Sequence, residues 1–152
     1  CQATTLSAIA QVHLSKSEPS GALDAAKEAL GLYRDLQNRK GTLEALDLLV
    51  KAYVQSGEAA AALEACKEQL KLFQQAKDQH GEASTYVTLF LAHRSQEDQE
   101  THANEALELA GDALELLRSL GDRVGEANMW LLVSETHLAY GMEQVAVQEA
   151  QE

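Results

Sequence analysis

The sequence predicts an all-α protein built as a solenoid of about four helix-turn-helix repeats. Three observations favour this fold class. Ala, Leu, Glu and Gln, which are strong helix formers, are abundant, whereas the chain has one proline and 5% aromatic residues. Apolar residues recur at helical spacing through nearly the whole sequence. The pattern also returns after 40 residues and again after 44, which favours a solenoid over a closed four-helix bundle.

Two apolar series alternate along the chain, so each unit is predicted to hold two amphipathic helices. Leu6, Leu46, Tyr86 and Trp130 occupy one position of the first series, and burial in the core is expected for Trp130. The second series includes a stripe predicted to pack between adjacent units, at Tyr33, Phe73 and Leu117.

Eight helices follow from these series. Pro19 opens one helix in its first turn, where its missing N–H group is not needed. Gly57 and Gly141 are expected to separate the two helices of their units, Gly121 to end a helix, and Asp122 to cap the next one. The expected ranges are 3–15, 19–37, 42–56, 58–77, 82–95, 103–120, 125–140 and 143–151.

The chain is expected to form a single repeat segment. Gly41, Gly81 and Gly125 mark the turn from one unit into the next, where a small residue permits the turn and close packing. The polar stretch 95–101 predicts a lengthened loop within the third unit. Because the chain begins with Cys1, it is expected to be an excerpt of a longer protein. The segment is 1–152, with units of about 3–40, 41–80, 81–124 and 125–152.

Charge and hydropathy exclude several classes of partner. Residues 1–77 carry nine basic and nine acidic side chains, whereas residues 78–152 carry three and fifteen. Because cations are scarce, we expect no nucleic-acid binding and no attraction to anionic membranes. No apolar run exceeds five residues, so no membrane insertion is expected. No secretory signal is visible and an intracellular location is favoured. The acidic half fits a basic partner, or is a solvated face that keeps the chain soluble.

No catalytic or metal-binding motif stands out, and no cofactor, metal or enzymatic activity is expected within these residues. His13, His93 and His137 share one repeat position, too far apart to hold one metal ion, and are expected to be half-buried packing residues. His80 and His102 are placed in loops without ligand spacing. Cys66 is expected to be a small buried apolar residue and not a reactive thiol. The acidic pairs of the 95–101 stretch fit solvated loop charge.

The repeat resembles the tetratricopeptide repeat (TPR) family. Matching sets of residues are Leu46, Leu49, Tyr53, Gly57, Ala62 and Cys66 in one unit, and Trp130, Val133, Ser134, His137, Gly141 and Ala146 in another. The longer period is similar to the repeats of kinesin light chains and G-protein-signalling modulators. The resemblance implies a right-handed α-solenoid whose first helices line a concave, partner-binding face.

Helix-face geometry combined with this resemblance gives a candidate partner-binding face. Its residues are Ser7, Gln11, Glu44, Asp47, Lys51, Ser84, Thr88, Leu91, Arg94, Asn128, Leu131 and Glu135. TPR domains that clamp the carboxylates of chaperone tails use several cations, whereas this face offers Lys51 and Arg94 alone, so such a tail is not expected. The open ends are a second candidate surface, because Val145, Ala146 and Ala150 have nothing after them to cover them.

Three hypotheses of function remain. The first is a non-enzymatic scaffold or adaptor that holds a protein or peptide partner on the concave helical surface. The second is a regulatory region of a larger enzyme. The third is a structural or assembly subunit of a multiprotein complex, with further repeats or other chains at its two ends.

Overall fold

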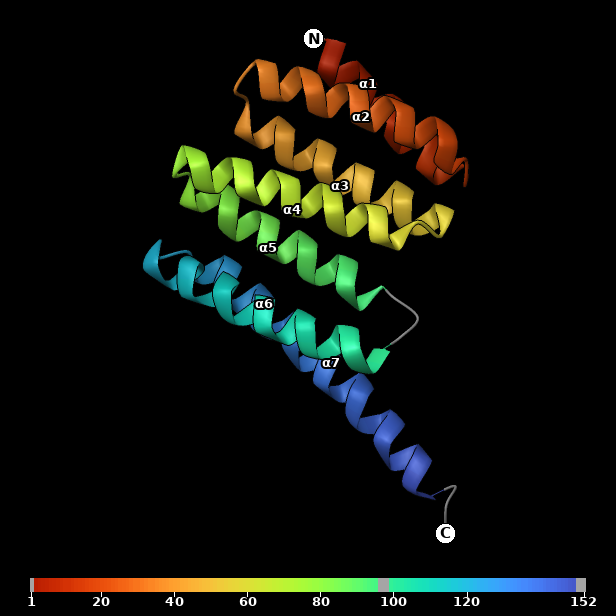
Figure 1. Cartoon of the computed structure of the whole chain (residues 1–152), viewed down its shortest axis with the longest axis vertical. Coiled ribbons are helices and arrows are strands. Elements are labelled where there is room, and N and C mark those ends of the chain that lie inside the picture. The colour runs from red at the N-terminus through yellow and green to blue at the C-terminus, as the bar shows by residue number, and fades with distance from the viewer. Residues whose placement is uncertain (1, 96–98, 150–152) are drawn as a thin grey trace.

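The computed structural model describes the backbone of residues 2–95 and 99–149, and the side chains of these residues apart from 99–101, 103 and 140–149. Within these ranges the fold is all-helical, as predicted (Figure 1). The helices are α1 (Gln2–Ser15), α2 (Pro19–Asp35), α3 (Arg39–Ser56), α4 (Ala59–Ala76), α5 (Gln79–Arg94), α6 (Gln99–Ser119) and α7 (Arg123–Glu149).

The helices pack as a solenoid in two layers. Each helix contacts the next one along the chain, so neighbours are antiparallel, and the stack advances from α1 to α7 (Figure 1). In addition, α1 packs on α3, and α3 packs on α5. These contacts place α1, α3 and α5 in one layer, and the ion pair between Arg94 and Glu135 links α5 to α7. We call these four the inner helices. The even-numbered helices form the other layer.

The first four turns recur every 20 residues, and all five described turns have the same backbone conformation. Ser17, Gln37, Gly57 and Lys77 all have positive φ angles, between 50° and 76°, and Gly121 follows with 69°. The amide after each of these residues donates a hydrogen bond to the carbonyl oxygen five residues before it, for example from Asp78 to Phe73 at 3.0 Å. This is the Schellman arrangement, in which a left-handed residue ends the helix and satisfies its last carbonyl groups.

The helices of the inner layer begin earlier than predicted, and the glycines have a different role. Asn38 and Asp78 cap α3 and α5 by accepting hydrogen bonds from the amides of Gly41 and Gly81, each at 3.1 Å. Asp122 accepts one from Gly125 at 2.9 Å, which confirms the predicted cap. The three glycines therefore lie in the first turn of a helix and do not make the turn between helices.

The predicted break at Gly141 is wrong. The helices expected at 125–140 and 143–151 form one continuous helix, α7, which includes Gly141 and is described to Glu149. An interior glycine costs a helix only about 1 kcal/mol relative to alanine, so it ends a helix only when the next residues gain by packing back. The predicted apolar side chains at Val145, Ala146 and Ala150 lie outside the described residues.

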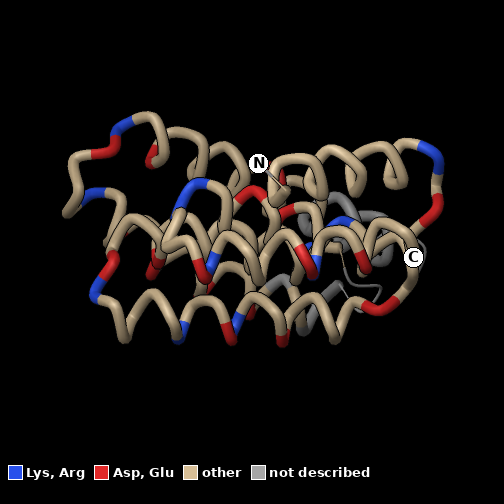
Figure 2. Tube along the Cα trace, turned by 90° about the horizontal axis from the view of Figure 1, so that it is seen from above, with Lys and Arg blue, Asp and Glu red and all other residues tan. Residues whose placement is uncertain are grey.

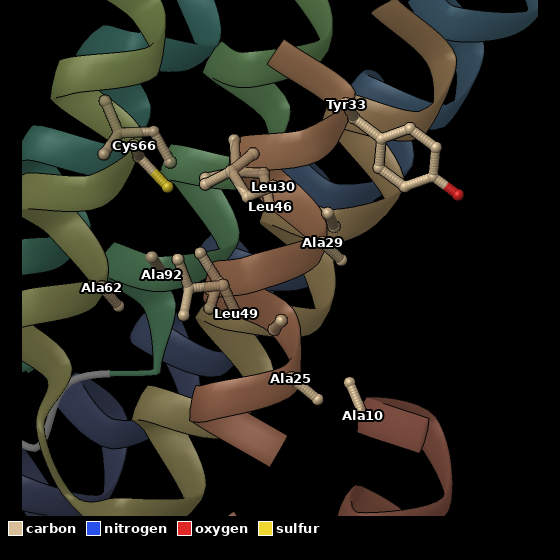
Figure 3. Close-up of a cluster of buried hydrophobic side chains, with 14 of the residues drawn as sticks. Ala10, Ala25, Ala29, Leu30, Tyr33, Leu46, Leu49, Ala62, Cys66 and Ala92 are labelled. Atoms are coloured by element: carbon tan, nitrogen blue, oxygen red, sulfur yellow. The ribbon is translucent and has the colours of Figure 1, made fainter. Parts of the chain in front are cut away.

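The core consists of two clusters that share α5. The larger one joins α1 to α5 and includes Leu30, Leu46 and Cys66, which meet between the two layers (Figure 3). The smaller one joins α5, α6 and α7 around Phe90 and Met129, both almost fully buried. Tyr33, Phe73 and Leu117 are buried, as predicted.

Trp130 is not buried as predicted: 49% of its surface is exposed. At the same repeat position Leu46 is fully buried, in the cluster that includes Ala62 and Leu63 of α4. The described part of α7 has no equivalent of α4 packed on this face, so Trp130 and His137 stay exposed while Met129 and Val133 fill the core. Trp130 is therefore more exposed than Leu46 because no second helix covers it within the described residues, and not because the register of α7 differs.

Candidate functional site

The main candidate site is a groove on the layer of inner helices, with a volume of about 320 Å³. Three helices contribute to it, mainly through the second half of each. We call it the inner groove. Its lining residues are Leu14 of α1, then Asp47, Val50, Lys51, Val54 and Gln55 of α3, then Thr88 and Leu91 of α5, and Ser95.

The floor of the inner groove is apolar and its rim is polar. Leu14, Val54 and Leu91 are the half-buried or exposed apolar residues of its lining, and 36% of Leu91 is exposed. Gln55 bridges α3 to α1 by donating a hydrogen bond from Nε2 to the carbonyl oxygen of Leu14, at 3.4 Å. An apolar recess with a few fixed polar groups at its edge is typical of a binding site for a ligand or a peptide side chain.

The structure brings part of the predicted partner-binding face together at this groove. Asp47, Lys51, Thr88 and Leu91 line it. The remaining predicted residues do not line it, and most are exposed elsewhere on the inner helices. They are Ser7 and Gln11 on α1, Glu44 on α3, Ser84 and Arg94 on α5, and Asn128, Leu131 and Glu135 on α7.

Both predicted cations of this face are already paired with carboxylates. Lys51 Nζ lies 2.6 Å from Asp47 Oδ2, one turn away on the same helix. Arg94 Nη1 lies 3.0 Å from Glu135 Oε2 and links α5 to α7. An incoming carboxylate would have to compete with these internal partners, so the face is poorly suited to hold an acidic tail.

Sequence reasoning included Leu91 but missed the apolar residues Leu14, Val50 and Val54 of the groove. Leu14 and Val54 are 40 residues apart and occupy the same repeat position. This recurrence of an apolar residue is the sequence pattern that could have identified them as groove residues. Val50 lies at the position where the TPR pattern expects a small residue. Its larger side chain is 5% exposed and contributes to the groove wall.

A second groove lies between α2, α3 and α4 and is more polar. Its volume is about 740 Å³. Arg34 crosses it from α2 to α4, donating to Gln69 Oε1 at 2.8 Å and to Glu68 at 3.0 Å. Leu72 contributes an exposed apolar side chain to this outer groove. Arg34 and Gln69 are engaged in joining α2 to α4, and Arg39 is paired with Asp78, which favours a structural role.

The histidines are arranged differently from the prediction. His13 is half-buried, as predicted, and lies 2.8 Å from Glu18, whereas His137 is exposed and His93 is buried. His80 and His102 lie within α5 and α6, not in loops. His102 Nδ1 is 3.3 Å from His93 Nδ1. The sequence did not predict this contact, because its pattern assigns His93 to a repeat position and His102 to a loop.

Burial lowers the pKa of His93, while nearby charges act in both directions. Desolvation of the ring is the largest cause; Glu105 opposes it by favouring the charged form, and His102 and Lys67 reinforce it. The structure therefore favours a neutral His93 ring near neutral pH.

Cys66 behaves as predicted. Its side chain is fully buried in the larger core cluster (Figure 3), and burial together with the charge of Asp47 raises the pKa of its thiol to about 12. The protonated thiol is a weak nucleophile, so Cys66 is a packing residue.

Charge on the described surface is mixed, with one acidic stripe. Acidic and basic positions are interspersed along the helices (Figure 2). On α6, however, Glu108, Asp112 and Glu115 lie on neighbouring turns, are exposed, and form no ion pair within the described residues. This stripe belongs to the acidic half identified in the sequence. Among the described residues, none of the helices combines the length and apolar character needed to cross a membrane.

Comparison with known proteins supports the fold. No protein-family model matches the chain, and no curated protein matches it. Among solved structures, the chain is similar to the apo form of RapI, with a TM-score of 0.68 at 14% sequence identity. The match covers 96% of this chain and 52% of RapI, so the chain spans about half the length of that protein. At this identity the likeness shows a helical-repeat fold and nothing finer.

Proposed function

We propose that this chain is a non-enzymatic protein-interaction module that holds a segment of a protein partner in the inner groove. The observation that carries this proposal is the convergence of α1, α3 and α5 on one apolar recess with a polar rim. A helical-repeat fold supports it further, because solenoids use their extended inner layer as a binding surface. The TPR type and its kinesin-light-chain variety remain part of the same proposal.

The size of the groove indicates how a partner would bind. A volume of about 320 Å³ accepts one or two apolar side chains. Each buried Leu-sized or Val-sized side chain contributes about 1.5–3 kcal/mol, whereas micromolar affinity requires about 8 kcal/mol. The partner therefore anchors an apolar residue in the groove and gains the rest of its affinity along Glu44, Ser84 and the other exposed inner positions.

The test compares two substitutions with matched exposure. Leu91→Glu places a charge in the inner groove, whereas Leu72→Glu places one in the outer groove; the two leucines are 36% and 38% exposed. Proteins that co-purify with the tagged chain are quantified for each variant, and circular dichroism checks folding. Loss of a specific partner by about tenfold or more in Leu91→Glu alone supports the proposal. Retention in that variant, or loss in Leu72→Glu alone, contradicts it.

The exposed face of α7 favours a second candidate, an assembly subunit. Val124, Leu131 and Leu138 lie seven residues apart on one face of α7 and are 72%, 59% and 67% exposed. Trp130, at the side of this face, is 49% exposed. An apolar face of this kind marks an interaction surface. If another chain or a second copy covers it, the isolated chain should self-associate, and Trp130→Ser with Leu138→Ser should make it monomeric. A wild-type chain that is monomeric by light scattering at high concentration would count against this candidate.

A further inference from the structure

Three side chains with metal-binding atoms meet where α5 ends and α6 begins. His93 lies in the last turn of α5, and His102 and Glu105 lie one turn apart in the first half of α6. The Nδ1 atoms of the two histidines are 3.3 Å apart. Glu105 Oε2 lies 3.2 Å from Nδ1 of His93 and 3.3 Å from Nδ1 of His102. The three atoms therefore form a nearly equilateral triangle.

This triangle has the dimensions of one face of a tetrahedral zinc site. Zn²⁺ binds nitrogen and oxygen ligands at about 2.0–2.1 Å, so two ligands of a regular tetrahedron lie about 3.3–3.4 Å apart. All three distances agree with that value to within 0.2 Å. Two imidazoles and one carboxylate are also a ligand set that binds zinc in proteins. We propose that His93, His102 and Glu105 form a binding site for Zn²⁺ or a similar divalent transition-metal ion.

Hydrogen bonds can satisfy this cluster only by leaving two like atoms in contact, for example when both Nδ1–H groups donate to Glu105 Oε2. A hydrogen bond needs one donor and one acceptor, and each Nδ1 atom is one or the other, depending on the tautomer. With three atoms in mutual contact, at least two must be alike, so every assignment of protons leaves a donor facing a donor or an acceptor facing an acceptor. A cation between them removes this conflict, because all three atoms then act as lone-pair donors to the metal.

The site lies where the repeat departs from its period. The loop predicted at 95–101 is shorter than expected, because residues 99–101 belong to α6. Residues 95–98 connect α5 to α6, whereas 16–18 connect α1 to α2 and 57–58 connect α3 to α4, so this connection is still the longest of the three. A metal ion held by His93 on one side and by His102 and Glu105 on the other would fasten α5 to α6 across this longer connection. His93 is buried, His102 is half-buried and Glu105 is 51% exposed, so the fourth ligand position faces solvent and suits a water molecule.

The test uses the 152-residue chain stripped of metal with a chelator. Isothermal titration with Zn²⁺ gives the affinity and stoichiometry, and thermal unfolding gives the effect on stability. We expect one Zn²⁺ per chain and a rise of about 5 °C or more in Tm when zinc is saturating. His102→Gln and Glu105→Gln should weaken binding by about tenfold or more and remove the rise in Tm. These two side chains are partly exposed, so the variants test the site even if His93→Gln fails to fold.

His80→Gln and His137→Gln are the matched controls, because both remove an exposed histidine outside the cluster. They should bind zinc as the wild type does. The near-ultraviolet and visible spectrum of bound Co²⁺ adds a second readout, since nitrogen and oxygen ligands lack the near-ultraviolet charge-transfer bands that a thiolate ligand from Cys1 or Cys66 would give. Absence of equimolar binding, or binding that His102→Gln and Glu105→Gln both retain, would overturn the proposal.

Discussion

Gly81 of α5 lies directly against the ring of Phe73 in α4, with no room for a side chain between them. Gly41 has the same relationship to the ring of Tyr33, one repeat earlier. Asp78 and Asn38 cap the same two turns. These two glycines, 40 residues apart, therefore permit close packing: the start of α3 touches the end of α2, and the start of α5 touches the end of α4.

Gly81→Ala should destabilise the chain. The new methyl group would meet the ring of Phe73, and such overpacking of a close contact costs about 1–3 kcal/mol. Gly111→Ala is the control, because nothing lies within 4 Å of a side chain at Gly111, in the middle of α6. That variant should gain about 0.5–1 kcal/mol from helix propensity. Urea unfolding measures both, and a stabilised Gly81→Ala variant would contradict the packing role.

Lys77→Gly should stabilise the chain by about 1 kcal/mol. Lys77 ends α4 with φ 55°, a left-handed conformation that is unfavourable for a residue with a side chain and free for glycine. Lys71→Gly, in the exposed interior of the same helix, should instead destabilise it by about 1 kcal/mol. The two midpoints in urea should move in opposite directions, and movement in the same direction would refute this interpretation of the turns.

Stability should fall at alkaline pH because of Cys66. Burial holds the pKa of its thiol at about 12, against 9.0 for an exposed thiol, so the unfolded chain loses this proton first. Between these values the free energy of unfolding should fall by about 1.4 kcal/mol per pH unit from this group alone. The comparison is between wild type and Cys66→Ala from pH 8 to 11. Parallel pH profiles of the two proteins would show that Cys66 does not contribute.

Trp130 should report on its own exposure, since it is the one tryptophan of the chain. Because 49% of its surface is exposed, its fluorescence should be quenched readily by iodide in the folded protein. Leu138→Ser should leave this quenching unchanged if the chain is monomeric and should increase it if a second copy covers α7. Emission protected from iodide in a protein that is monomeric by light scattering would mean that Trp130 is buried, against the structure.

The fold was predictable because its determinants are local and repeated. Pro19, Gly57, Gly121 and the cap at Asp122 act within a few residues of themselves, and the structure confirms each one. The continuation of α7 through Gly141 was not predictable from the same signals. A glycine separates helices only where the following segment packs back, and no local pattern reveals whether it does.

The candidate site was only partly predictable, because it depends on contacts between repeats. Lys51 and Leu91, both included in the predicted face, line the same groove, but helix-face geometry did not indicate that Lys51 would pair with Asp47 there. The approach of His102 to His93 was equally hidden. The third unit is four residues longer than the 40-residue repeat, so the repeat register does not place His102 opposite His93.

The most direct test of the proposed function is to record contact with the partner itself. A photo-crosslinking amino acid is placed at Gln55, on the rim of the inner groove, and in a second protein at Gln75, an exposed position on α4. A partner that binds in the inner groove should crosslink from Gln55 and not from Gln75, and Leu91→Glu should abolish the crosslink. A partner that crosslinks from Gln75 alone, or from Gln55 in the Leu91→Glu variant at undiminished yield, would show that the inner groove does not bind it.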